Sequence, residues 1–125
     1  MTDKQHSIVL IEDEEMLANM YETKFKTEGY KIRKALDGEK GLKMIEEDLP
    51  DLILLDIIMP KLDGFSVLKR IKENAKSKNI PVILLTNLGQ DEDIKKGQAL
   101  GAVGYLVKAN LTPAEVVAKV KDFLK

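Results

Sequence analysis

The chain alternates short apolar runs with longer segments in which apolar residues recur at the spacing of a helix. The apolar runs are rich in leucine, isoleucine and valine, and they predict β-strands at residues 7–12, 30–35, 51–56, 80–86 and 103–107. The amphipathic segments that follow each run predict helices at residues 14–28, 37–48, 65–75, 91–100 and 112–124. The pattern therefore consists of five strand–helix units in strict alternation.

This alternation predicts an α/β fold: a doubly wound, five-stranded parallel sheet with five helices distributed over both faces. The first, third and fourth strands are apolar throughout, so we expect them to be buried on both faces. The second strand alternates apolar and charged residues, so we place it at an edge of the sheet. The strand order 2-1-3-4-5 fits these constraints. In such a sheet, ligands bind at the carboxyl ends of strands 1 and 3, where the connection reverses.

Residues at the ends of the predicted helices support these boundaries. Asp37 can cap the start of the second helix, and Gly29 and Gly101 are suited to end the first and the fourth. Thr112 and Glu115 have the spacing of a capping box at the start of the last helix.

Composition narrows the class of protein. A chain of 125 residues predicts one domain spanning residues 1–125. The net charge of −1 excludes a generally basic nucleic-acid-binding protein. No apolar run approaches the roughly 18 residues of a membrane span, and no signal peptide is evident, so we expect a cytoplasmic protein with no direct nucleic-acid or membrane partner. The absence of cysteine excludes disulfides and thiolate chemistry, and the single histidine, His6, argues against a histidine-rich metal site.

Four of the five predicted strands end in a charged or hydroxyl side chain. These residues are Glu12 and Asp13 after the first strand, Asp56 at the third, Thr86 at the fourth and Lys108 after the fifth. The carboxyl ends of parallel strands lie along the same edge of a sheet, so we expect these side chains to meet. Any one of them alone would be unremarkable, because loops that follow strands are usually polar.

The charges in this group indicate a missing cation. Two carboxylates about 4 Å apart repel each other by roughly 4 kcal/mol at an effective dielectric constant of about 20. Three carboxylates and one ammonium group leave two negative charges, which one divalent cation would balance, and oxygen ligands favour Mg²⁺. A carboxylate beside Mg²⁺ and a lysine stays ionised and can attack phosphorus. The Mg²⁺ ion, Lys108 and the Thr86 hydroxyl could then stabilise the transferring phosphoryl group.

These residues resemble the receiver domain of two-component response regulators, which has a flavodoxin-like fold. The resemblance covers essentially the whole chain and rests on the Glu12-Asp13 pair, Asp56 in LLDIIMPKLDG, Thr86 after PVILL, the Gly101-Ala102 turn, Tyr105 and Lys108. It implies that Asp56 is the phosphoacceptor and takes a phosphoryl group from the phosphohistidine of a histidine kinase or phosphotransfer protein. The domain would catalyse this transfer and a slow autodephosphorylation as a signalling protein, not as a turnover enzyme.

The resemblance also implies a metal site and a switch. Asp13, Asp56 and the backbone carbonyl of Ile58 would bind Mg²⁺ directly, Glu12 would act mostly through water, and Lys108 would contact the phosphoryl group. Thr86 would move toward the phosphoryl group while Tyr105 turns inward. This movement would remodel the face formed by helix 4, strand 5 and helix 5, through which a downstream protein target would be controlled. Gly64 would serve the turn that follows the phosphoacceptor.

Three departures from the family pattern concern the site. Ala109 stands where a cis-proline usually follows the lysine, and we predict a trans Lys108–Ala109 bond, because a cis bond without proline costs about 3–4 kcal/mol. Asn87 replaces a small residue after Thr86, and we expect its amide to donate to a phosphoryl oxygen. Ile58 and Leu88 are bulky and apolar at two positions that flank the site, so we expect them to hinder an attacking water and lengthen the life of the aspartyl phosphate.

Other functions remain open at this point. A flavodoxin-like cofactor binder would need a phosphate-binding loop after the first strand, where the sequence EDEE repels phosphate. A phosphohydrolase of the aspartyl-phosphate type would need an acid at the position of Ile58, and a Walker-type GTPase would need a GxxxxGK[ST] motif that the chain lacks. A degenerate receiver that acts as a phosphorylation-independent interaction module is the main alternative. No output segment follows the last predicted helix, which favours a stand-alone receiver over a fragment.

Overall fold

The computed structural model describes residues 5–124, and within them five strands alternate with five α-helices. The strands are β1 (Ser7–Ile11), β2 (Lys31–Ala35), β3 (Leu52–Leu55), β4 (Val82–Thr86) and β5 (Gly104–Val107). The helices are α1 (Glu15–Thr27), α2 (Gly38–Glu47), α3 (Gly64–Glu73), α4 (Asp91–Ala99) and α5 (Pro113–Phe123), and a one-turn 3₁₀ helix, Lys108–Asn110, follows β5. Each predicted element is present, with ends that differ by a few residues.

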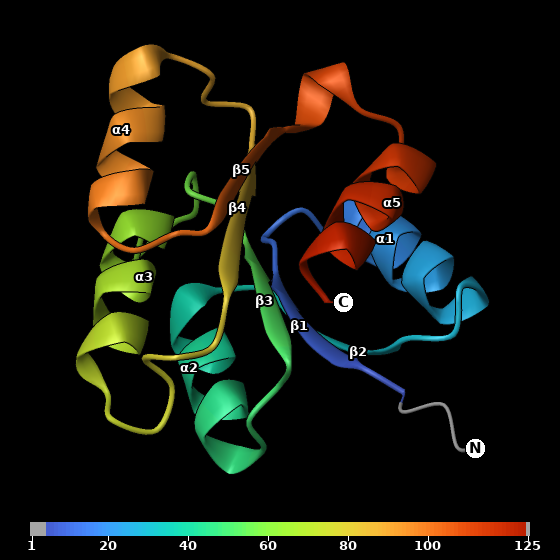
Figure 1. Ribbon diagram of the computed structural model, residues 1–125, viewed down its shortest axis with the longest axis horizontal. Coiled ribbons are helices and arrows are strands. Elements are labelled where there is room, and N and C mark those ends of the chain that lie inside the picture. Colours follow the sequence, from blue (N-terminus) through green and yellow to red (C-terminus); the bar gives the residue numbers. More distant parts are fainter. Residues whose placement is uncertain (1–4, 125) are drawn as a thin grey trace.

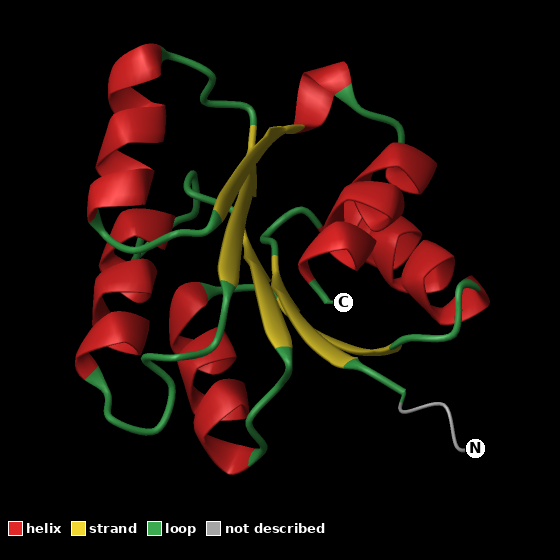
Figure 2. Ribbon diagram, viewed as in Figure 1, coloured by secondary structure: helices red, strands yellow, loops and turns green. Residues whose placement is uncertain are grey.

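The strands form one parallel sheet in the order β2-β1-β3-β4-β5, as predicted. Figure 1 shows α1 and α5 on one face of this sheet and α2, α3 and α4 on the other. The same two helical layers enclose the strands in Figure 2. The fold is therefore the predicted doubly wound α/β arrangement.

The sheet separates two hydrophobic cores, and successive residues of its inner strands point into them alternately. Ile8 and Leu10 of β1 belong to the core beneath α1 and α5, whereas Val9 and Ile11 belong to the core beneath α2 and α3. All four side chains are at most 1 % exposed. Burial on both faces explains why β1 is apolar from Ile8 to Ile11, and β3 and β4 are likewise buried at every position.

The edge position of β2 matches its mixed sequence. Lys31 is exposed, while Ile32 and Ala35 are buried against the helices. Among the described strands, β2 pairs only with β1, and β3, β4 and β5 follow in order on the other side of β1. Because all the pairs are parallel, the carboxyl ends of β1, β3, β4 and β5 lie along one edge of the sheet.

Side chains cap α2 and α5 at the predicted places. The Asp37 carboxylate accepts a hydrogen bond from the backbone N–H of Lys40 at 2.8 Å at the start of α2. Thr112 and Glu115 form the reciprocal capping box of α5. None of the helices in the described part of the chain combines the length and the apolar character that a membrane crossing requires.

Candidate functional site

The carboxyl ends of the strands enclose a small pocket of about 250 Å³. It is lined by seven residues: Glu12, Asp13, Glu14, Asp56, Ile58, Asn87 and Lys108. Six of them belong to the site expected from the sequence. Glu14 is an addition, and its only signal in the sequence was its place in the acidic run after β1.

Three carboxylates converge at this pocket. Glu12 and Asp56 are buried, with 1 % and 5 % of their surface exposed, and Asp13 is exposed. One carboxylate oxygen from each of the three lies within 4.8 Å of the others. Such a set of oxygen ligands, open to solvent on the side of Asp13, suits Mg²⁺. The residues present therefore fit the metal predicted from the sequence.

Lys108 joins two of these carboxylates. Its Nζ lies 2.7 Å from Oδ2 of Asp56 and also donates a hydrogen bond to Oε1 of Glu12. Burial by itself would lower the pKa of Lys108, but the hydrogen bonds to Asp56 and Glu12 raise it above its usual value. Lys108 is therefore a fixed positive charge beside Asp56.

The buried position of Glu12 disfavours the charged form of its side chain. Burial raises the pKa of Glu12 above its usual value, even though hydrogen bonds from Lys108 and from the backbone N–H of Glu14 act in the opposite direction. A buried carboxylate retains its charge best beside a cation. Lys108 supplies one such charge, and a divalent cation at the pocket would supply more.

The backbone orients the Asp56 side chain. The N–H groups of Ile57 and Ile58 donate to Oδ1 of Asp56 at 2.7 and 3.3 Å, while Oδ2 faces Lys108. The loop after Asp56 returns closely against the strand end, where Gly64 N–H donates to the Ile57 carbonyl at 2.8 Å. A Cβ on Gly64 would lie 2.1 Å from the Asp56 carbonyl oxygen, so only glycine permits this approach.

Thr86 and Tyr105, the predicted switch residues, meet at the loop between β4 and α4. Thr86 is fully buried, and its hydroxyl accepts a long hydrogen bond, 3.4 Å, from the backbone N–H of Leu88. The Tyr105 hydroxyl donates to the Leu88 carbonyl. Neither side chain lines the pocket. The structure therefore links both residues through the backbone of Leu88, a link that the sequence did not indicate.

The two apolar residues expected to flank the site lie in different places. Ile58 lines the pocket and is 56 % exposed. Leu88 is half-buried and packs against the core beneath α2 and α3, and it is not among the pocket residues. The expectation that Leu88 hinders an attacking water stays a prediction, and in this structure its side chain packs against the core instead of lining the pocket.

Asn87 and Ala109, the other two departures, are bonded to each other. The amide oxygen of Asn87 accepts a hydrogen bond from the backbone N–H of Ala109 at 3.0 Å. Every peptide bond in the described residues is trans, which confirms the prediction for Lys108–Ala109. The sequence gives no sign of this contact, because one of its two partners is a backbone N–H group.

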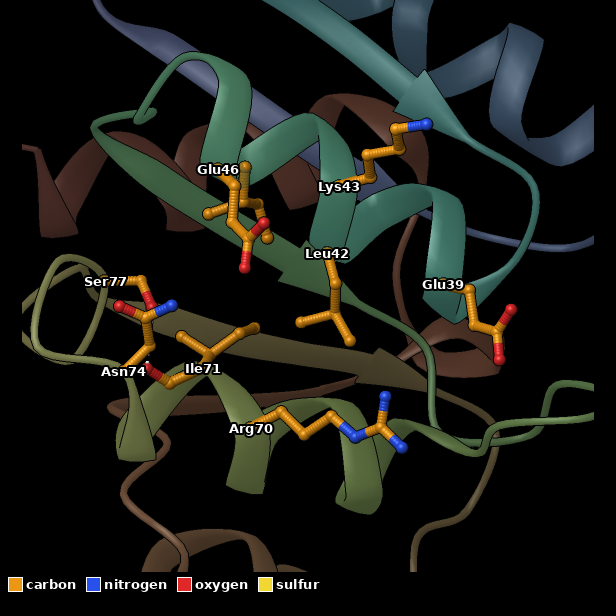
Figure 3. Close-up of a pocket in the computed structure, with 9 residues that line it drawn as sticks. Glu39, Leu42, Lys43, Glu46, Arg70, Ile71, Asn74 and Ser77 are labelled. Carbon is orange, nitrogen blue, oxygen red and sulfur yellow. Dashed lines mark hydrogen bonds between the residues drawn. The ribbon is translucent and has the colours of Figure 1, made fainter.

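A second pocket, of about 360 Å³, lies between α2 and α3, away from the strand ends. Figure 3 shows Leu42 of α2 and Ile71 of α3 facing each other across it, with Glu39 and Glu46 on the α2 side and Arg70 on the α3 side. It contains none of the strand-end carboxylates. The convergent polar groups expected of a reactive site are at the smaller pocket.

Comparison with known proteins identifies the family. The family model described as the response regulator receiver domain matches residues 8–121. The DNA-binding dual master transcriptional regulator RpaA of Synechocystis sp. is 36 % identical over 118 residues, which cover 94 % of this chain and 48 % of that protein. The chain spans about half the length of the curated relatives it matches.

Solved structures agree with this match. The receiver domain of the Francisella response regulator 1452 has a TM-score of 0.87 at 30 % identity and covers 96 % of this chain and 97 % of that one. The Vibrio cholerae chemotaxis protein CheY4 has a TM-score of 0.90 at 25 % identity, covering 95 % and 98 %. The chain belongs to the response regulator receiver domain family, and it is a receiver domain of two-component signalling.

Proposed function

We propose that Asp56 accepts a phosphoryl group from the phosphohistidine of a histidine kinase or phosphotransfer protein. The observation that carries this proposal is the placement of Asp56 Oδ2 2.7 Å from the Lys108 ammonium group, within a cluster of three carboxylates. A nucleophile, a fixed cation and a set of oxygen ligands for a metal thus lie together at one small opening.

The chain's own groups support each part of the transfer. Hydrogen bonds from Ile57 and Ile58 fix Oδ1 of Asp56, which leaves Oδ2 as the attacking oxygen. As the bond from Oδ2 to phosphorus forms, the phosphorus–nitrogen bond of the donor breaks, and the imidazole leaves with the electron pair. Lys108 is placed to offset the negative charge of the phosphoryl oxygens.

Mg²⁺ is the cofactor that this site would use. Asp13, Asp56 and the Ile58 carbonyl would bind it directly, and Glu12 would contribute through water. When bound, the ion would supply positive charge opposite the phosphoryl oxygens. The carboxylate oxygens that lie within 4.8 Å of one another support this assignment.

The output surface of the switch is the face formed by α4, β5 and α5. Thr86 would respond to the phosphoryl group, and Tyr105 would transmit the change through Leu88, to which both residues are hydrogen-bonded. Two large apolar side chains are partly exposed near this face: Val103 at 49 % and Phe123 at 41 %. These side chains are available to pack against a protein target.

We further propose that this region acts in the cytoplasm and reaches its target by protein contact, without binding nucleic acid or membrane itself. The charge balance of −1 supports this view. RpaA is named as a DNA-binding regulator, and it is about twice as long as the region that matches this chain. The target of the switch is therefore either a separate protein or another segment of a longer regulator.

Phosphorylation by a small-molecule donor tests the proposal. The protein is incubated with acetyl phosphate, with Mg²⁺ or with EDTA, and its intact mass is recorded. We expect one phosphoryl adduct with Mg²⁺ and none with EDTA. Asp56→Asn should remain unmodified, and Asp48→Asn, at an exposed position after α2, should be modified like the wild type. A wild-type protein without an adduct would favour the degenerate receiver, a pure interaction module.

A further inference from the structure

The ends of β4 and β5 lie side by side in register. Thr86 pairs with Val107 in the sheet, so Asn87 and Lys108 are the residues that directly follow these two adjacent strands. The side chain of Asn87 spans the gap and accepts the hydrogen bond from Ala109 N–H at 3.0 Å. The Asn87 side chain, in the loop between β4 and α4, thereby holds the backbone immediately after Lys108.

This hydrogen bond gives the backbone N–H of Ala109 an acceptor that its own turn does not provide. Lys108–Asn110 form a single 3₁₀ turn, and the first N–H groups of a helix have no partner within it. Val107, at the cap position of this turn, provides no side-chain cap. Asn87 therefore caps the turn from the neighbouring loop.

The contact also orients the Asn87 amide. A backbone N–H can only donate, so the amide oxygen must face Ala109 and the NH₂ group must form the other end. Within the described residues that NH₂ group donates no hydrogen bond, and Asn87 is part of the pocket wall beside Asp56. The contact thus leaves a hydrogen-bond donor for the pocket.

We propose that Asn87 is a positioning residue for Lys108. The hydrogen bond from the Ala109 N–H to the Asn87 amide oxygen is called the clasp. It holds the backbone on one side of Lys108, and the pairing of β5 with β4 holds the backbone on the other side. The clasp fixes the ammonium group between Glu12 and Asp56, and it ties the 3₁₀ turn that begins at Lys108 to the loop that follows Thr86. The proposal rests on phosphorylation of Asp56 for its effect on rate, but the clasp itself does not.

A double-mutant cycle separates positioning from direct contact with the phosphoryl group. Asn87→Ala removes the acceptor, and Ala109→Pro removes the donor; the proline Cβ and Cγ chemical shifts are used to check that the bond after Lys108 stays trans, as in the structure. We expect Asn87→Ala to lower the maximal phosphorylation rate at saturating acetyl phosphate by about threefold to tenfold, the worth of one hydrogen bond. In the Ala109→Pro background the same change should lower the rate by less than in the wild type, because only a contact of the Asn87 NH₂ group with the phosphoryl group is then left to lose. An equal loss in both backgrounds would overturn the proposal, because Asn87 would then act on the phosphoryl group alone.

A second measurement does not depend on phosphorylation. Hydrogen exchange of the Ala109 amide, followed by NMR, should be faster in Asn87→Ala and should return toward the wild-type rate in Asn87→Asp, which keeps an acceptor oxygen. Asn110→Ala is the matched control, because Asn110 is exposed in the same turn and no hydrogen bond of its side chain is found in residues 5–124. An unchanged Ala109 exchange rate in Asn87→Ala would refute the clasp even if Asp56 is phosphorylated.

Discussion

The Nζ of Lys108 lies 2.7 Å from Oδ2 of Asp56, although 52 positions separate the two residues in the chain. The parallel sheet creates this contact, because it brings the carboxyl ends of β3 and β5 to the same edge. Burial makes the contact effective, since the side chain of Lys108 is only 9 % exposed. A charge pair in such surroundings is screened less than one on the surface.

The carboxylate cluster predicts that Mg²⁺ stabilises the folded protein. A ligand at a hundred times its dissociation constant raises the free energy of unfolding by about 2.7 kcal/mol. We expect Mg²⁺ to raise the melting temperature, and Asp13→Asn to remove most of that rise. Asp13 is exposed, so this change should alter the metal site more than the fold. Thermal unfolding with Mg²⁺ and with EDTA measures the effect.

Glu47→Gln is the matched control for this measurement, because Glu47 is an exposed acid at the end of α2. It should respond to Mg²⁺ as the wild type does. An equal rise in Asp13→Asn and in the wild type would show that Mg²⁺ acts elsewhere on the protein.

The exposed side chain of Ile58 predicts control of the phosphoryl lifetime. Ile58→Asn replaces an apolar wall of the pocket with an amide that can orient a water molecule. We expect phosphate to be released about tenfold faster, as one added hydrogen bond in the transition state would produce. Leu88→Gln should change the lifetime little, because Leu88 packs against the core. Phosphate release after removal of the donor measures both, and a wild-type rate in Ile58→Asn would contradict the account.

Tyr105 predicts a loss of stability at high pH. Burial, with smaller effects of Asp93 and Asp56, raises the pKa of Tyr105 to about 12. A tyrosine in the unfolded chain titrates near pH 10. Between about pH 10 and about pH 12 the unfolded chain therefore releases a proton that the folded protein keeps, so this contribution is complete below pH 10 and is lost as the pH rises.

Urea unfolding of the wild type and of Tyr105→Phe tests this dependence at about pH 9 and about pH 11. The stability of the wild type relative to the variant should fall between the two values. Tyr21 and Tyr30 also have raised pKa values, mainly through burial, but they are present in both proteins. A constant difference between wild type and variant would mean that the pKa of Tyr105 is not raised in the folded protein.

Much of the fold was predictable because the local patterns agree with the tertiary arrangement. β3 and the apolar residues 8–11 of β1 lie inside the sheet, and mixed β2 lies at its edge. The Asp37 cap and the Thr112–Glu115 capping box depend only on neighbouring residues, so they too were evident from the sequence. Residues at strand ends could be placed together because a parallel sheet aligns those ends.

The contacts that the sequence did not reveal lie in the loops. Tyr105 donates to the backbone carbonyl of Leu88, and every residue has such a carbonyl, so no residue type marks the acceptor. The direction of the Leu88 side chain follows from the turn after β4 and not from hydropathy. Asn87 bonds to the N–H of Ala109, which is likewise a backbone group without a signature in the sequence.

Chemical trapping of the phosphorylated residue tests the central claim most directly. The protein is phosphorylated with acetyl phosphate and Mg²⁺ and treated with borohydride, which reduces an aspartyl phosphate to homoserine. Peptide sequencing by mass spectrometry then locates the modified position. The account predicts homoserine at the position of Asp56 and unmodified carboxylates at Glu12 and Asp13. Reduction at Asp13, or no reduction at Asp56 in a phosphorylated sample, would contradict it.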